Sequence, residues 1–367
     1  MYKHLFRGLC LSIVLTLTGT NVFANQVNTQ ASPMKVKVVV VSMFEIGNDE
    51  GDAPGEFQLW KERQKLTTKY PLSHGFHDIY ANTETGVIGI VTGMGIARAA
   101  SAIMALGLDT RFDLTDAYWL VAGIAGVDPL DNTIGSAIWT DYVVDGDLAH
   151  QIDAREIPTN WKTGYFPLFT HGPYENADNV NPNNSPNGEV YVLNQSLMKW
   201  AYSISKDTEL FNTPAMDSLR SKYTGYPNAL LKPSVSIGSH LSASTFWHGK
   251  LLNEWANDWV KYWTKSKGNF VTSGMEDSAT LQSLEYLHNA GLVNKQRVMI
   301  LRTASNFTMQ PASLSAAENL KQESEGEGYA AMGSAIEAAY RVGVNVVDFI
   351  VKHWNDTQHK EPSIIAE

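Results

Sequence analysis

The chain has 367 residues, of which 44% are hydrophobic and 18% are charged, a composition typical of a protein that folds around an apolar core. Its formal net charge of −10 argues against nucleic acid and anionic membranes as partners, because both require a basic face. The single cysteine excludes a disulfide framework and a cysteine-rich metal site, and we expect no bound metal. The length allows one large α/β domain or two ordinary ones.

The first 24 residues have the features of a secretory signal peptide. Lys3 and Arg7 give a positive start, an apolar run follows over residues 9–17, and Ala24 ends a small-residue cleavage site. The apolar run is about half of the roughly 20 residues that a membrane span needs, which argues against an anchor. We therefore expect a periplasmic or secreted protein. Removal of this segment, with Lys3, Arg7 and Cys10, changes the net charge from −10 to −12 and leaves no cysteine.

Beyond a polar, flexible lead-in over residues 25–34, strand and helix signals alternate along the chain. Dense apolar runs predict buried strands at 36–41, 87–92, 117–122 and 297–303. Small residues predict a closely packed helix over 97–108, and apolar residues at three- or four-residue spacing predict a long helix over 329–354. Asn, Pro and Gly dominate 171–188, which we expect to form a long surface loop. This alternation predicts a mainly parallel sheet covered on both faces, in a single domain over residues 35–367, and no membrane-spanning helix in it.

Two of the predicted strands end in glycine-rich turns. Gly93 follows the second strand, and the third strand leads into Gly123, Ile124, Ala125 and Gly126. In open α/β sheets, ligands bind at the carboxyl ends of strands, where glycine lets backbone N–H groups approach an anion. We therefore place a candidate anion or water site at these five residues. Tight packing between strand and helix explains the same glycines equally well and stays open as the alternative.

Several segments resemble the purine nucleoside permease family. They are GIAGVDP at residues 123–129, GSAIWTD at 135–141, DAREIP at 153–158 and GYFPL at 164–168. The resemblance covers roughly residues 35–354 and extends more distantly to the nucleoside phosphorylase and nucleosidase superfamily. It implies a three-layer αβα sandwich with a mixed, mostly parallel central sheet, as in the nucleoside phosphorylases. It also implies that the partners are purine nucleosides, and that no cofactor is needed other than phosphate as an optional co-substrate. Assembly into a homo-oligomer stays open.

The resemblance places the ribose at Met275 and Glu276, where a predicted strand meets a helix. In the superfamily, a Glu at this position grips the ribose hydroxyls, and the preceding Met packs on the sugar. A carboxylate suits a vicinal diol because it accepts two charge-assisted hydrogen bonds. The alternative is structural, since the helix dipole favours acidic residues at a helix start by about 0.3–1 kcal/mol.

Candidate residues for the purine base follow two other strands. By resemblance, Asn306 takes the position that contacts the purine N7, next to Ser305. A donor at N7 stabilises the negative charge that develops on the leaving base, although Asn cannot transfer a proton. Phe246 and Trp247 are the candidate aromatic wall, because base stacking contributes roughly 1–3 kcal/mol in nucleic-acid systems. The structural alternatives are a turn or helix cap for Ser305 and Asn306, and the apolar core for the two aromatics.

The turn after the first strand bears on the reaction. Phosphorolytic relatives carry a glycine and a basic residue there for phosphate, whereas hydrolytic relatives carry a carboxylate that activates water. This chain has Glu45 and no Lys or Arg before Lys61. Val121 and Ile124 also stand where phosphorolytic relatives of the hexameric type have an Arg and a Ser. The resemblance therefore favours hydrolysis, with Glu45 and Asn306 as the catalytic residues.

These observations predict an exported protein that recognises purine nucleosides and supports their uptake by cleaving the N-glycosidic bond, with hydrolysis favoured over phosphorolysis. A non-catalytic nucleoside-binding or transport component is one alternative. A purine nucleoside phosphorylase is the other, provided that backbone N–H groups at residues 123–126 hold phosphate.

Overall fold

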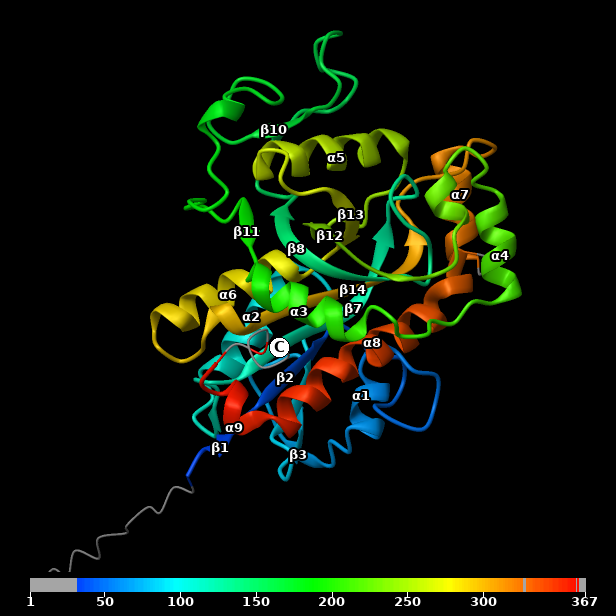
Figure 1. Ribbon diagram of the computed structural model, residues 1–367. Helices are drawn as coiled ribbons and strands as arrows, with labels where there is room; N and C mark the ends of the chain where they lie inside the picture. Colours follow the sequence, from blue (N-terminus) through cyan, green and yellow to red (C-terminus); the bar gives the residue numbers. More distant parts are fainter. Residues whose placement is uncertain (1–31, 326–327, 361, 363–367) are drawn as a thin grey trace, which may run out of the picture. The chain divides into compact units, whose positions relative to one another are not determined.

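A mixed sheet forms the centre of the computed structural model, which describes residues 32–325, 328–360 and 362 (Figure 1). The strands follow the order β11-β8-β12-β13-β7-β2-β5-β4-β3, and β14 pairs with both β7 and β8. They are β2 (Val38–Ser42), β3 (Thr68–Tyr70), β4 (Ile79–Asn82), β5 (Val87–Val91), β7 (Tyr118–Val127), β8 (Ala137–Asp145), β11 (Val190–Val192), β12 (Val235–Ser242), β13 (Phe270–Gly274) and β14 (Val298–Phe307). The short strands β1 (Met34–Lys35) and β6 (Phe112–Asp113) pair separately. The predicted signal peptide and most of the predicted lead-in lie outside the described residues.

Parallel pairings make up most of this sheet. β14 pairs with β7 over nine positions, β12 with β8 over seven, β2 with β5 over five, and β2 with β7 and β12 with β13 over four each. The antiparallel ladders of the described strands in this sheet are only two or three positions long. The expected mixed, mostly parallel sheet is therefore confirmed.

Helices cover both faces of the sheet, as expected. They are α1 (Gln58–Arg63), α2 (Ile96–Gly107), α3 (Gln195–Ser205), α4 (Pro214–Ser221), α5 (Lys250–Thr264), α6 (Asp277–Asn289), α7 (Ala316–Ser324), α8 (Met332–Lys352) and α9 (Trp354–Thr357). The valines of β2 alternate between the two layers, as strand geometry requires. Val39 packs in the cluster that contains α2 and α6, whereas Val40 packs in the cluster that contains α1, α3 and α8.

Two strands extend further than their apolar sequence predicts. β7 continues to Val127 and β14 to Phe307, so the residues 123–126, 305 and 306, expected in turns, lie within strands. The reason is tertiary, because these two strands pair with each other beyond Ala122 and Thr303 and so satisfy their backbone groups. A register shift between Ala304 and Asn306 marks a bulge, which redirects the side chains that follow it.

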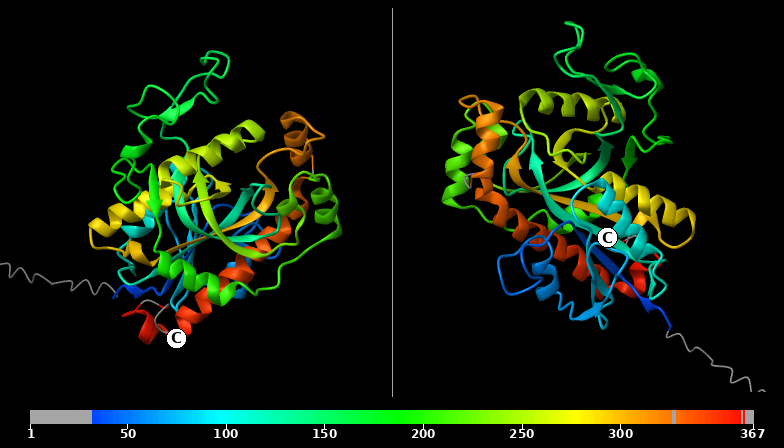
Figure 2. Two further views of the ribbon diagram at one scale, coloured as in Figure 1. Left: turned by 45° about the horizontal axis from the view of Figure 1, so that its top comes forward. Right: turned by 180° about the vertical axis from the view of Figure 1, so that it is seen from behind.

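A long excursion, residues 146–189, leaves the sheet after β8 and returns at β11. It contains the hairpin of β9 (Ala149–Gln151) and β10 (Tyr165–Pro167), and the predicted surface loop forms its second half. Figures 1 and 2 show this segment standing off from the sheet on the side of α5. Tyr165 packs on Trp255 of α5 with ring centroids 4.9 Å apart, and the Tyr262 hydroxyl donates a hydrogen bond to the Glu175 carbonyl at 2.8 Å. The excursion is therefore attached to α5.

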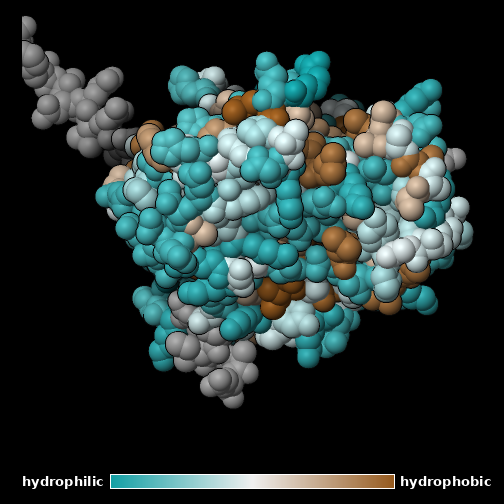
Figure 3. Space-filling view, turned by 90° about the horizontal axis from the view of Figure 1, so that it is seen from above, coloured by the Kyte–Doolittle hydropathy of each residue, from teal (hydrophilic) through white to brown (hydrophobic). Residues whose placement is uncertain are grey.

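The surface carries apolar side chains in separate patches. Figure 3 shows them on one face as brown areas among hydrophilic residues. In the part of the chain that the structure describes, no helix has the length and apolar character needed to cross a bilayer.

Candidate functional site

A cavity of about 330 Å³ lies where the chain leaves several strands of the sheet. Its walls come from the ends of β7, β13 and β14 and from the segments that follow β2, β5 and β12. The lining residues are Met43, Phe44, Glu56, Met94, Ile124, Ala125, Gly126, Thr245, Phe246, Trp247, Ser273, Gly274, Met275, Glu276, Arg302, Ser305, Asn306, Thr308 and Met332. The surface of the cavity is mainly apolar, so its three charged side chains, Glu56, Glu276 and Arg302, are the candidates for specific recognition.

Most residues that the sequence singled out meet in this cavity. Those that line it are Ile124, Ala125, Gly126, Phe246, Trp247, Met275, Glu276, Ser305 and Asn306. Three others, Glu45, Gly93 and Gly123, do not line it. The fold therefore brings the predicted ribose and base residues together, while the roles assigned to them stay predictions.

Glu276 presents a buried carboxylate at the cavity wall. Its Oε1 accepts a hydrogen bond from the Gly95 N–H at 3.1 Å, and its Oε2 accepts from the Met275 N–H at 3.2 Å and from Arg302 Nη2 at 3.1 Å. Gly95, with φ of 91°, adopts a conformation that favours glycine and directs its N–H group at this carboxylate. The carboxylate is thus held in place from three segments of the chain.

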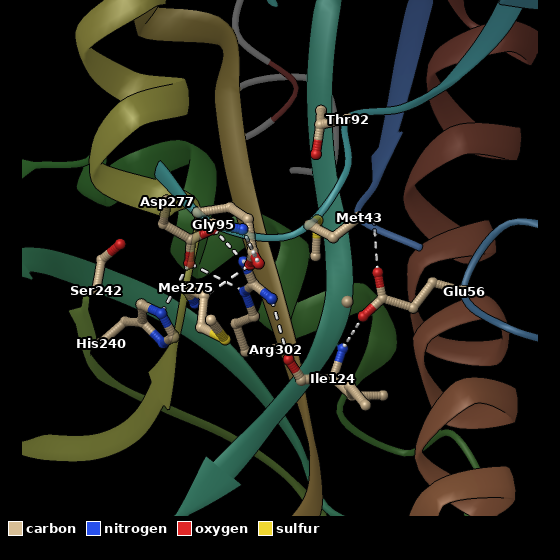
Figure 4. A network of polar contacts seen from close by, with 12 residues as sticks. Met43, Glu56, Thr92, Gly95, Ile124, His240, Ser242, Met275, Asp277 and Arg302 are labelled. Atoms are coloured by element: carbon tan, nitrogen blue, oxygen red, sulfur yellow. Dashed lines mark hydrogen bonds and ion pairs between the residues drawn. The ribbon is translucent and has the colours of Figure 1, made fainter. Parts of the chain in front are cut away.

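Arg302 is the charged residue at the centre of the site, and sequence analysis missed it. Its Nε and Nη2 donate to the two oxygens of Asp277 at 3.0 and 2.5 Å, and its Nη1 donates to the Ile124 carbonyl at 3.0 Å (Figure 4). Burial opposes its charge, but Asp277 and Glu276 raise the pKa of Arg302 above its usual value. Burial alone would raise the pKa of Asp277, yet Arg302 lowers it, so the pair is ionised.

His240 extends this network away from the cavity. Its Nδ1 lies 2.9 Å from the Thr272 hydroxyl, and its Nε2 lies 3.0 Å from Asp277 Oδ2 without the alignment of a hydrogen bond. Burial lowers the pKa of His240 to about 4 despite the neighbouring carboxylate. At neutral pH this histidine is therefore uncharged, and Arg302 carries the positive charge of the cluster.

Glu56 supplies a second carboxyl group at the cavity, again missed by sequence analysis. Its Oε2 accepts from the Met43 N–H and its Oε1 from the Ile124 N–H, each at 2.7 Å. Burial raises the pKa of Glu56 to about 8; Arg302 counteracts this rise, and Glu276 adds to it. Figure 4 shows Glu56 and Arg302 on the two sides of Ile124. The cavity thus contains a carboxyl group that titrates just above neutrality.

Gly123 and Gly274 make room for these buried charges. A Cβ atom on Gly123 would lie 2.7 Å from Glu56 Oε1 and 3.0 Å from Arg302 Nη1. One on Gly274 would lie 2.9 Å from His240 Cε1 and 3.3 Å from Arg302 Cζ. For Gly123, close packing is therefore the better interpretation of the glycine-rich strand end than direct contact with an anion.

Glu45, the expected catalytic residue, lies outside the cavity and binds backbone N–H groups. Its carboxylate accepts hydrogen bonds from the N–H groups of Ile46, Gly55, Phe57 and Gln58, at 2.8 Å for Ile46 and 2.9 Å for Phe57. These bonds connect the turn after β2 to the start of α1, where backbone N–H groups need acceptors. The carboxyl group that we expected from this turn is present at the cavity, but Glu56 provides it.

Gly93 also lies outside the cavity. Its φ is 81°, and a Cβ atom there would lie 2.8 Å from Arg98 Cδ and 3.0 Å from the Phe76 ring. This glycine is explained by the turn between β5 and α2 and by that close contact.

The base-binding candidates differ in how firmly they are held. Asn306 Oδ1 accepts from the Ser305 hydroxyl at 2.9 Å, and its Nδ2 donates to the Phe307 carbonyl at 3.2 Å. Because an amide nitrogen carries two hydrogens, one remains for a ligand. Trp247 packs against Trp255 and Phe270, with ring centroids 6.1 and 6.0 Å away, whereas Phe246 is 55% exposed.

A partial signal for the missed residues exists in the sequence. Arg302 follows four consecutive apolar residues of a predicted buried strand, and a charge in such a strand needs a buried partner. Asp277 follows the Met-Glu pair directly, but nothing local distinguishes Glu56 from a surface acid.

Within residues 32–325, 328–360 and 362, no group of three or more His, Cys, Asp or Glu side chains is arranged to hold a metal ion.

Known proteins resemble this chain in sequence and in fold. A probable purine nucleoside permease of Schizosaccharomyces pombe is 29% identical over 360 residues, covering 96% of this chain and 99% of that protein. A purine nucleoside permease of Candida albicans is 30% identical over 322 residues, covering 87% of this chain and 76% of that protein. Among solved structures, the futalosine hydrolase of Helicobacter pylori matches with a TM-score of 0.50 at 12% identity, covering 86% of this chain and 98% of that one, which shows a common fold.

The sequence also matches the family described as purine nucleoside permease (NUP) over residues 35–362. This match spans nearly all of the described domain, including every residue that lines the cavity. The chain therefore belongs to the purine nucleoside permease family.

Proposed function

We propose that this protein binds purine nucleosides in the cavity and hydrolyses their N-glycosidic bond. The names of the two permease relatives support the ligand class. The observation that carries the proposal is the pair of carboxyl groups, Glu56 and Glu276, on either side of one guanidinium group in a cavity with mostly apolar walls. Such a pair, held in two different environments, is suited to acid–base chemistry on a bound sugar.

Glu276 binds the ribose in this proposal. Its carboxylate is buried, held by Gly95, Met275 and Arg302, and still has acceptor capacity, because each carboxylate oxygen has about two lone-pair sites. About one of these sites remains open, on Oε1, and one hydroxyl of the vicinal diol donates a hydrogen bond to it. Met275 adjoins it and packs on the sugar.

Asn306 and the aromatic pair bind the base. The free N–H of the Asn306 amide donates to the purine N7, and Phe246 and Trp247 contact the faces and edge of the ring. As the C1′–N9 bond breaks, its electron pair moves onto the purine, and a donor at N7 stabilises that charge. The leaving base takes its proton from solvent, because an amide cannot supply one.

Glu56 activates the water that replaces the base. In its ionised form it accepts one proton from water while the water oxygen bonds to C1′. Because its pKa is about 8, the ionised Glu56 is a stronger base than an ordinary carboxylate. For the same reason, most Glu56 side chains are protonated at neutral pH. The excess of carboxylates over cations in the cluster also favours the positive charge that develops on the sugar.

The same charges favour hydrolysis over phosphorolysis. Arg302 is the only guanidinium group among the residues that line the cavity, and it already faces Asp277 and Glu276. A phosphate dianion in the cavity would therefore meet the carboxyl groups of Glu276 and Glu56 without a free cation. Phosphorolysis would depend on backbone N–H groups at residues 123–126, and the Ile124 N–H already donates to Glu56.

Release of free base from inosine or adenosine tests the proposal directly. We expect base release by the purified protein in the absence of phosphate, and loss of release in Glu56→Gln. Release only with phosphate would establish phosphorolysis, and measurable nucleoside affinity without release would establish a binding protein that passes nucleosides to a transporter.

We also propose that the N-terminal segment directs export, so that cleavage or capture takes place outside the cytoplasm in support of uptake. Mass spectrometry of the protein recovered from its producing cells would identify a mature chain that begins at Asn25. Recovery with the first 24 residues intact would contradict export by cleavage.

A further inference from the structure

A side compartment of about 90 Å³ adjoins the main cavity. Thr245 and Trp247 line both spaces, so the segment after β12 forms the wall between them. The other walls include Asp147, Gln151 and Tyr165 of the excursion and Trp255 of α5. At roughly 30 Å³ per water molecule, the space accommodates a group of about three to five non-hydrogen atoms.

Three aromatic side chains that contact one another line this compartment. The indoles of Trp247 and Trp255 are nearly perpendicular, at 84°, with ring centroids 6.1 Å apart. The Tyr165 ring packs on Trp255 at 4.9 Å. The face of an aromatic ring attracts an ammonium group placed against it, and these side chains offer such rings to a ligand in the compartment.

A carboxylate completes this arrangement. Asp147 lies at the rim, where its Oδ2 accepts a hydrogen bond from the Ser244 N–H at 2.6 Å. Burial and the charge of Asp147 both raise the pKa of the Tyr165 phenol, so this charge acts on one of the aromatic residues that line the compartment. Asp145, whose Oδ1 accepts from the Asp147 N–H, adds a second acidic group nearby. The lining contains no Lys or Arg to neutralise Asp147.

We propose that this side compartment binds an ammonium group, and that the ligands of the main cavity include purine nucleosides with a cationic amine on the base. The ammonium site stands on the compartment alone, whereas its connection to a nucleoside rests on the proposed function. In the proposed function, the base lies beside Thr245 and Trp247, which line both spaces. A short substituent on the base therefore reaches past these two residues into the side compartment.

Tetramethylammonium and tert-butanol test the ammonium site, because both have five non-hydrogen atoms and only the first is charged. Titrations of the full chain at constant ionic strength, followed by indole fluorescence, should show about tenfold tighter binding of tetramethylammonium. Asp147→Asn keeps an acceptor for the Ser244 N–H and should abolish this preference. Asp153→Asn, in the same excursion but outside the compartment, is the matched control and should retain it.

Tyr165 provides a second pair of variants. Tyr165→Phe keeps the aromatic face and should keep the preference for the cation, whereas Tyr165→Leu should weaken it. Equal binding of the two probes by the unmodified protein, or an unchanged preference in Asp147→Asn, would overturn the ammonium site.

Two adenosine derivatives then test the connection to the main cavity. One carries a 2-(dimethylamino)ethyl group on N6, and the other carries the neutral 3-methylbutyl group of the same shape. We expect the amine to bind at least about tenfold more tightly, and this difference to vanish in Asp147→Asn. Equal affinities would overturn the connection. If neither nucleoside binds, the proposed function fails, and the titration with tetramethylammonium still decides the ammonium site.

Discussion

The guanidinium group of Arg302 binds both carboxylate oxygens of Asp277, through Nε at 3.0 Å and Nη2 at 2.5 Å, in a fully buried position. These two hydrogen bonds hold the positive charge of the site against Asp277, which does not line the cavity. As a consequence, Glu276 and Glu56 share a cation that is already paired. The charge balance of the site thus depends on a residue behind its wall.

Removal of the Asp277 charge should destabilise the protein and change the titration of Glu56. In Asp277→Asn, Arg302 loses the carboxylate that accepts from two of its nitrogens, and breaking a buried pair in this way costs about 3–5 kcal/mol. The freed guanidinium charge should also lower the pKa of Glu56, because Arg302 already acts in that direction. Urea unfolding measures the first effect, and the pH profile of base release measures the second.

Asp153→Asn is the control for that experiment. Asp153 pairs with the exposed Arg155, so its loss should leave the free energy of unfolding nearly unchanged. A similar small change in Asp277→Asn would show that the buried pair contributes little to stability.

Nucleoside affinity should depend on Glu276. Replacement of its carboxylate by an amide in Glu276→Gln exchanges charge-assisted hydrogen bonds for weaker ones, and hydrogen bonds to charged groups contribute about 1.5–3 kcal/mol each. We therefore expect inosine to bind at least about tenfold more weakly by calorimetry. Unchanged affinity in Glu276→Gln or Glu276→Ala would mean that the ribose lies elsewhere.

Base release should rise with pH as Glu56 loses its proton. The pKa of about 8 in the free protein predicts an increase in kcat/KM between roughly pH 7 and 9. Glu56→Gln should release almost no base at any pH, whereas Glu45→Gln should retain most of the activity, because that side chain only accepts backbone hydrogen bonds outside the cavity. Loss of activity in Glu45→Gln with a folded protein would reverse this assignment.

The same proton should make folding stability depend on pH. The pKa of Glu56 is about 8 in the folded state against an ordinary value of 4.5, so the folded protein binds this proton more tightly than the unfolded chain does. Its contribution is complete below about pH 4.5 and is lost as the pH rises to 8, by at most about 1.4 kcal/mol per pH unit. The difference in unfolding free energy between the unmodified protein and Glu56→Gln, measured from pH 5 to 8, isolates this group. A difference that does not change with pH would show that Glu56 is ionised throughout.

Gly123 should tolerate no side chain. A Cβ atom there would approach Met43 Cε and Glu56 Oε1 closely, so Gly123→Ala should displace both residues, lower stability by about 1–3 kcal/mol and reduce base release. Gly225→Ala is the matched control, because nothing lies within 4 Å of its added Cβ atom. Equal thermal stability of the two variants would contradict the close approach of Glu56 and Arg302 around β7.

The fold could be predicted largely from sequence because its signals are local. The valines of β2 and the apolar runs of β5, β7 and β14 are buried on both faces, as a dense apolar run predicts for a strand inside an α/β sheet. The sequence could not reveal that β7 and β14 extend past those runs, because the extension depends on their pairing with each other. The motif residues Gly126 and Asn306 consequently lie in strands.

By itself, the sequence determined the α/β architecture, the family and the positions of Met275, Glu276, Ser305 and Asn306 at one end of the sheet, since short motifs and hydrophobic periodicity carry that information. Only the tertiary structure decided which charges meet. Glu45 and Glu56 are both acids near the start of α1, but one binds backbone N–H groups outside the cavity and the other is buried against β7. Burial and proximity set the pKa values of Glu56, Asp277 and His240, and neither is a property of the local sequence.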